Sequence, residues 1–291
     1  MSETHNTAKL DLSILFLMAC YTLLVFIPGL YDNLWYQFLL APALLFPGLS
    51  HGAADHHLDW QGKPRGLSLF ILRYIAIMLL VAGIWLLFPI LGLFIFLLFS
   101  AWHFGETDLR EWGIYNPIQA FLFGLGILGL LLLTHLPETV GILTAMEIAE
   151  FGEWLTVVHK PGILFSVACC LIPAVRLPVL KWGSYFILLL MLALGVLLPL
   201  FSAFLWYFCA WHSIRGWMHL RILTGYSNQL LLRVAYPFTL GALVFFAVLL
   251  LFYPYFIAAE TKSYTIFFVF IAALSTPHIF TMHNSYRKNI N

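Results

Sequence analysis

The sequence predicts an all-α integral membrane protein, a polytopic helical bundle of about 8–10 transmembrane helices. Hydrophobic residues make up 62% of the 291 residues, and charged residues make up only 9%. A soluble domain carries about 25% charged residues, so most of this surface must face lipid. Apolar stretches near the length of a membrane-spanning helix, about 20 residues, recur along the whole chain.

Ten apolar segments can be separated on this basis. Pro89 and Pro199 mark two tight connections, which suit antiparallel neighbouring helices. No internal repeat or soluble domain is visible, so residues 1–291 are expected to form a single membrane domain. The segments are 12–30, 34–51, 69–88, 90–103, 117–135, 161–176, 183–199, 201–219, 234–257 and 265–283.

Three stretches lie outside these segments. Residues 136–157 are too acidic to span a bilayer and are expected to form an amphipathic stretch at its interface. Residues 1–11 and 284–291 are expected to be short cytoplasmic tails. The N-terminal sequence has no cationic region followed by a cleavage site, so no removable signal peptide is expected.

The distribution of basic residues predicts an orientation. With ten spans and a cytoplasmic N-terminus, eleven Lys and Arg residues fall on the cytoplasmic side, within or beyond the ends of the spans, and only Lys160 and Lys262 fall on the other. This asymmetry follows the positive-inside rule and predicts a multi-pass inner (plasma) membrane protein with both termini cytoplasmic. A net charge of +1 argues against nucleic-acid binding, which needs a basic patch.

Four histidines end, or nearly end, spans that run toward the cytoplasm. They belong to the second, fourth, eighth and tenth spans, so they should arrive at a similar depth in the bundle. Imidazole is the commonest metal ligand among side chains, and several buried imidazoles are costly unless each has a partner. The sequence therefore predicts a buried metal site built from His51, His103, His212 and His278.

Each histidine lies in a short polar motif. In SHGAAD, Asp55 is one helical turn from His51 and can orient an imidazole. In WHFGETD, Gly105 is expected to let the chain turn so that Asp108 folds back toward His103. An ordinary charged cytoplasmic loop would show the same sequence pattern. In WHSIRGWMH, Arg215 suits a positive-inside anchor better than a catalytic group. His56, His57 and His283 are expected at the interface.

Together these motifs resemble those of the Brp/Blh family of membrane β-carotene dioxygenases, which supply retinal to microbial rhodopsins. The resemblance extends from residue 51 to residue 278 and consists of four short motifs in the same order. They are His51-Gly52 with Asp55, His103-Phe104-Gly105 with Asp108, His212-Ser213 with Arg215, and Pro277-His278.

The resemblance implies an Fe(2+) centre with His51, His103 and His212 as ligands. It implies no catalytic residue beyond the metal site, and it implies that Asp55, Asp108 and Arg215 support the ligands. The substrates would be dioxygen and a lipid-soluble carotenoid, cleaved at its central double bond to give retinal. The chain departs from the family at Gly216, where the family has a second iron-binding histidine. His278 or His219 could replace that ligand, or the centre has three histidines.

Other classes of protein fit part of the pattern. A non-catalytic accessory protein for rhodopsin assembly or a transporter would also carry polar residues inside the membrane. A di-iron oxidase or desaturase gathers histidines at one membrane face, but commonly in HxxxH pairs, which are absent here. A haem protein would need histidines facing each other across two helices. The four cysteines lie in apolar runs and read as small buried side chains.

Overall fold

The computed structural model describes residues 2–27, 48–60, 66–252 and 262–288. These residues form helices joined by short connections, with no strand among them, which confirms the all-α fold class. The helices are α1 (Ser2–Val25), α3 (His56–Trp60), α4 (Gly66–Leu87), α5 (Pro89–Glu111), α6 (Pro117–Thr134), α7 (Leu136–Ala145), α8 (Ala149–Val157), α9 (His159–Leu171), α10 (Trp182–Gly195), α11 (Leu200–Leu205), η3 (Trp206–His212), α12 (Ser213–Thr224), α13 (Asn228–Phe252) and α14 (Lys262–Lys288), with short 3-10 turns η1 (Ile172–Val175) and η2 (Val179–Lys181) before α10.

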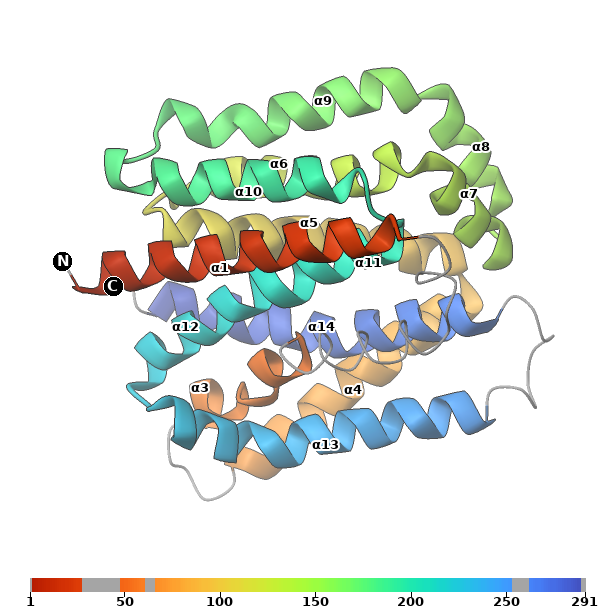
Figure 1. The fold of residues 1–291 in the computed structure, drawn as a ribbon. Coiled ribbons are helices and arrows are strands. Elements are labelled where there is room, and N and C mark those ends of the chain that lie inside the picture. The colour runs from red at the N-terminus through yellow and green to blue at the C-terminus, as the bar shows by residue number, and fades with distance from the viewer. Residues whose placement is uncertain (1, 28–47, 61–65, 253–261, 289–291) are drawn as a thin grey trace.

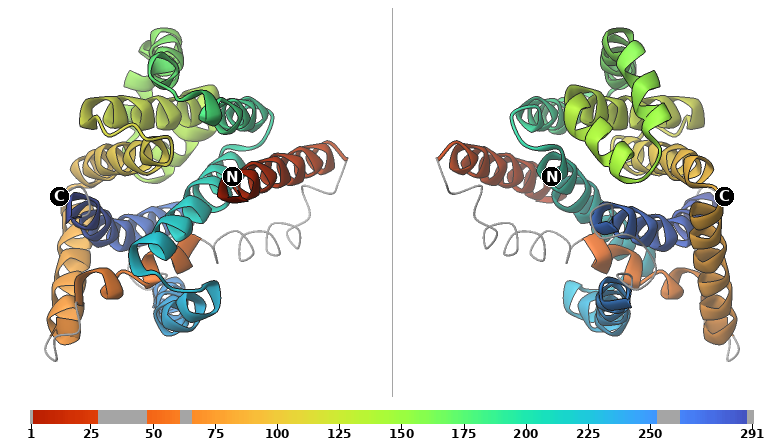
Figure 2. Two further views of the ribbon diagram at one scale, coloured as in Figure 1. Left: turned by 90° about the vertical axis from the view of Figure 1, so that its left-hand side faces the viewer. Right: turned by 90° about the vertical axis from the view of Figure 1, so that its right-hand side faces the viewer.

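The long helices run roughly alongside one another, and both chain termini lie at the same end of the bundle (Figure 1). At the opposite end, the short helices α7 and α8 run across the direction of the long ones (Figure 1). They occupy the acidic stretch 136–157 that was expected at the membrane interface. An end-on view shows α4 and α13 standing apart from each other on the side of the molecule away from α9 (Figure 2).

Prolines begin several helices where the sequence predicted tight connections. Helix α4 ends at Leu87, Phe88 connects it to α5, and Pro89 is the first residue of α5. Pro199 directly precedes α11. A proline at a helix start loses no hydrogen bond, because the first N–H groups of a helix have no partner within it. Pro117 opens α6 in the same way, where the Asn116 side chain accepts a hydrogen bond from the Gln119 N–H at 3.0 Å.

Five of the described helices are long and apolar enough to cross a membrane, and the bent pair Ala149–Val157 and His159–Val175 would make six. The five are Thr7–Val25, Gly66–Leu87, Pro89–Glu111, Pro117–Thr134 and Asn228–Ala247. The expected segments 183–199 and 201–219 are represented by shorter or interrupted helices. The expected segment 34–51 lies mostly outside the described residues, of which 48–53 are helical.

The structure corrects the expectation that Gly105 lets the chain turn. Helix α5 continues through Gly105 to Glu111, well beyond the expected end of this segment at residue 103. A Cβ atom at Gly105 would overlap the Ala120 carbonyl oxygen, and one at Gly124 would overlap the Ala101 carbonyl oxygen. The two glycines therefore serve the close approach of α5 and α6, as small residues do in membrane helix pairs.

Candidate metal centre

The four predicted histidines lie together in the middle of the fold, although four different segments carry them. His51 comes from helical residues 48–53, His103 from α5, His212 from η3 and His278 from α14. The ring centroid of His278 lies 4.6 Å from that of His51 and 5.0 Å from that of His103. The His212 centroid lies 4.8 Å from that of His103 and 5.6 Å from that of His51. All four side chains are buried.

Several ring nitrogens of these histidines lie close to one another inside the cluster. Ligand nitrogens of His51, His103 and His278 all lie within 4.8 Å of one another. The Nε2 atoms of His103 and His212 are 3.2 Å apart. Nδ1 of His212 and Nε2 of His278 are buried without a hydrogen-bond partner. Unpartnered buried nitrogens are costly, and neutral imidazoles suit ions such as zinc, copper and iron, so this set fits a transition metal.

A π-helical segment presents His212 to the cluster. The backbone of Trp206–His212 forms a π-helix between the regular helices α11 and α12. Ser213, the first residue of α12, donates a hydrogen bond from its hydroxyl to the Phe208 carbonyl oxygen at 2.6 Å. Such segments are rare and frequently occur at functional sites, because the extra residue rotates the following side chains around the helix. The sequence carried no signal for this local change.

Two glycines of the sequence motifs make room for imidazole rings. A Cβ atom at Gly52 would lie 3.3 Å from Nδ1 of His278. A Cβ atom at Gly216 would lie 2.8 Å from Cδ2 of His51, closer than real contacts allow. Gly216 therefore provides the space that His51 fills in this protein.

Asp55 makes the contact that a metal-binding histidine usually requires. Its carboxylate accepts hydrogen bonds from Nδ1 of His278 at 2.8 and 3.0 Å, and both side chains are buried. The carboxylate thus orients His278, which is 223 positions away, instead of His51 on its own segment. A histidine held in this way keeps its Nε2 atom available for a metal.

Asp108 and Arg215 do not contact the histidines as the sequence analysis expected. The Asp108 carboxylate accepts a hydrogen bond from the Tyr207 hydroxyl at 3.0 Å. Arg215 forms an ion pair with Asp11 of α1 at 2.7 Å, and its guanidinium lies 3.2 Å from the ring centroid of Trp211. Both members of the ion pair are buried, so Arg215 is not an exposed anchor. Their positions follow from α5 remaining helical and from α1 packing beside η3.

His219 lies in a second polar layer, two helical turns from the cluster. Its Nδ1 atom is 2.8 Å from the Tyr286 hydroxyl, and its Nε2 atom is 3.4 Å from the Glu111 carboxylate. Lys181 donates to the same carboxylate at 3.1 Å. Glu111, His219 and Tyr286 come seven or eight residues after His103, His212 and His278 on the same run of helix, about 10–12 Å further along. This layer ties α5, α12 and α14 together.

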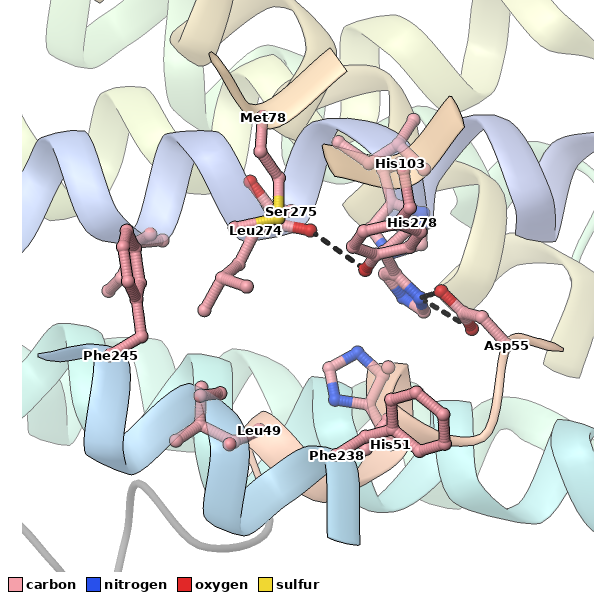
Figure 3. Close-up of a pocket in the computed structure, with 18 of the residues that line it drawn as sticks. Leu49, His51, Asp55, Met78, His103, Phe238, Phe245, Leu274, Ser275 and His278 are labelled. Carbon is pink, nitrogen blue, oxygen red and sulfur yellow. Dashed lines mark hydrogen bonds and ion pairs between the residues drawn. The ribbon is translucent and has the colours of Figure 1, made fainter. Parts of the chain in front are cut away.

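A cavity of about 410 Å³ adjoins the histidines (Figure 3). Beyond the polar groups at the histidine cluster its walls are almost entirely apolar, with aromatic side chains from several helices. The described residues that line it include Phe70, Tyr74, Met78, Phe96, Phe104, Phe204, Phe208, Phe238, Phe245 and Leu274, besides His51, Asp55, His103 and His278. In Figure 3, Phe245 lies far from the imidazoles, and Leu49, Met78 and Leu274 lie between them.

The other histidines of the motifs contribute less directly. His56 is buried against the ring of Phe238, with centroids 4.4 Å apart, which corrects the expectation of an interfacial residue. Burial, followed by the neighbouring His57, lowers the pKa of His56 to about 4, so this ring is neutral at pH 7. His57 contacts the Tyr226 hydroxyl at 3.2 Å, and His283 contacts the Glu106 carboxylate at 3.2 Å.

Sequence reasoning missed three residues of this region: Asp11, Tyr207 and Tyr286. Asp11 looked like part of a polar N-terminal tail, and Tyr207 lies in an unbroken apolar run. Tyr286 lies eight residues after His278, a spacing that places both residues near one stripe of α14 and is the one signal that the sequence offered for it.

The fold and the site define a helical membrane protein with a buried histidine cluster beside an apolar cavity. Comparison with known families matches residues 43–285 to the family described as β-carotene 15,15'-dioxygenase, and the chain belongs to this family. No curated protein matches the chain. No solved structure matches it either.

Proposed function

We propose that this protein cleaves β-carotene, or a closely related carotenoid, at its central double bond with dioxygen, and that it releases two molecules of retinal. In this reaction the central carbon–carbon bond breaks, and each of the two carbons receives one oxygen atom of dioxygen. The observation that carries the proposal is the meeting of four buried imidazoles with an apolar cavity in a chain of this family.

We propose that His51, His103, His212 and His278 hold one Fe(2+) ion. Iron held by these neutral imidazoles would supply the redox chemistry of oxidative cleavage. Asp55 would fix the ring of His278 by accepting a hydrogen bond from its Nδ1–H, which leaves Nε2 unprotonated. Gly52 and Gly216 leave space for two of the rings. No side chain needs to act as a general acid or base, since both oxygen atoms of dioxygen end in carbonyl groups.

The cavity supports an apolar substrate that arrives from the bilayer. Phe104 and Phe208 line it near the imidazoles, Phe96 lines it further along α5, and all three provide flat surfaces for a polyene. Buried walls of this kind exclude water from the reacting bond. We further propose that the protein lies in the plasma membrane with both termini cytoplasmic, and that its product serves a microbial rhodopsin, as the family resemblance implies.

Three other functions remain as outcomes of the test. An accessory role in rhodopsin assembly or a transport function predicts no consumption of carotenoid. A different histidine-rich oxidoreductase predicts a product other than retinal. The apolar cavity beside the cluster favours the carotenoid reaction over transport of polar solutes.

The direct test is expression in bacteria that accumulate β-carotene, with pigments separated by chromatography. We expect bleaching of the cells together with retinal formation, and neither in a His103→Ala variant that is present in the membrane at the same level. Bleaching with other cleavage products would contradict central cleavage. Persistent colour in cells with abundant, iron-loaded protein would favour the accessory role.

A further inference from the structure

The cavity beside the histidines opens on one side of the molecule only, as judged from the described residues that line it. Lining residues from α5 and α14 are buried or partly buried. The exposed lining residues all belong to α4 or α13, and they are Ile75, Pro237, Phe238, Gly241 and Phe245. The mouth of the cavity therefore lies between α4 and α13, the two helices that stand apart in Figure 2.

This mouth faces hydrocarbon rather than water. Only 11% of the spanning part of α4 and 17% of that of α13 is buried, against 56% for α5. Large apolar side chains are exposed beside the mouth, among them Leu72 and Leu79 on α4 and Leu240 and Val244 on α13. Such surfaces are stable only against lipid chains.

Gly241 lies at the mouth of the cavity and carries no side chain. It lines the cavity and is exposed, and a Cβ atom added to it would meet nothing within 4 Å. A larger side chain there would therefore extend into open space without disturbing the backbone. Ile75 lies at the same mouth on α4, and it is 46% exposed.

We propose that the carotenoid enters sideways from the bilayer between α4 and α13, and that Gly241 is the residue that keeps this entrance wide enough for a rod-like polyene. This inference rests on the proposed function for the identity of the substrate. From the mouth, the polyene reaches the imidazoles along Met78, Leu274 and Phe208, which line the cavity. Entry from lipid spares a long apolar molecule any passage through water.

The test compares Gly241→Phe with Gly83→Phe. Gly83 is also a helical glycine whose Cβ would meet nothing within 4 Å, but it does not line the cavity. Each protein is purified without oxygen from cells that accumulate β-carotene, and the retained carotenoid is measured by absorbance per mole of protein. We expect Gly241→Phe to retain about tenfold less carotenoid than wild type, with Gly83→Phe and the iron content of both unchanged.

A size series separates blockage from misfolding. Gly241→Ala should retain nearly as much carotenoid as wild type, Gly241→Leu less and Gly241→Phe least, and Ile75→Trp should reproduce the loss from the opposite edge. Undiminished retention by Gly241→Phe, equal loss in Gly83→Phe, or no retention by wild type would each overturn the proposed entrance. Failure of the proposed reaction would give a different result from failure of the entrance. Carotenoid retention would then follow the size series, but neither the wild type nor any variant would form retinal.

Discussion

The Nδ1 atom of His278 lies 2.8 Å from Oδ2 of Asp55, although 223 positions separate the two residues in the chain. Both side chains are buried, and the other ring nitrogen of His278 faces the histidine cluster without a hydrogen-bond partner. A buried carboxylate that accepts a hydrogen bond from one imidazole nitrogen determines which nitrogen is left for a metal. This contact makes His278, rather than His219, the proposed fourth ligand.

Replacing His278 should therefore release iron, whereas replacing His219 should not. We expect both His278→Ala and His51→Ala to lose most of their metal, because both rings lie in the cluster. His219→Ala should retain iron, since its ring contacts Tyr286 and Glu111 instead. Iron per mole of purified protein is the measurement. Iron loss in His219→Ala but not in His278→Ala would reverse the assignment.

Asp55→Asn should weaken metal binding without removing a ligand. Loss of a carboxylate that orients a ligating histidine typically lowers metal affinity about 10–100-fold. Competition with a chelator measures this change in the purified protein. Asp108→Asn is the matched comparison, because Asp108 is also a buried carboxylate but accepts from Tyr207. An equal loss of affinity in both variants would mean that the contact with His278 has no special role.

Gly216→Ala should disturb the cluster, and Gly216→His should not rebuild the family's histidine pair. Any Cβ atom at this position would lie 2.8 Å from the His51 ring, so His51 must move. Overpacking of this kind costs about 1–3 kcal/mol of stability. We expect lower iron content and a lower melting temperature in both variants. Gly141→Ala, where a Cβ meets nothing within 4 Å, serves as the control. Higher iron content in Gly216→His would show that the cluster has an unfilled ligand position.

Breaking the ion pair between Asp11 and Arg215 should destabilise the fold. Removing one member of a buried pair leaves an uncompensated charge and costs about 3–5 kcal/mol. Thermal unfolding in detergent should show a large fall in melting temperature for Asp11→Ala, and a smaller fall for Asp11→Ala combined with Arg215→Met. If the double variant is no more stable than Asp11→Ala, the two charges do not act as a pair.

Topology reporters test which end of the bundle faces the cytoplasm. Fusions after Arg110 and Gly225 should report the cytoplasm, and a fusion after Ala145 should report the opposite side. Helices α5 and α12 end near the end of the bundle that carries both termini, and α7 lies at the other end (Figure 1). Identical readings at all three positions would contradict a bundle that crosses the membrane.

Sequence alone was sufficient for the fold class, the family and the residues that gather at the site. Apolar runs near the length of a membrane span can only be helical, because hydrocarbon offers no partner for backbone groups. Four histidines at the same ends of alternate segments then had to approach a common depth. These conclusions depend on segment length, composition and short motifs, which a sequence records directly.

Only the tertiary structure decided which partners each side chain meets. Asp55 orients His278 instead of His51, Arg215 pairs with Asp11, and Gly105 admits a neighbouring helix instead of a turn. The π-helical turn before Ser213 and the mouth between α4 and α13 were equally invisible in the sequence. Such contacts depend on the rotation and spacing of helices against one another, which are fixed by packing between residues far apart in the chain.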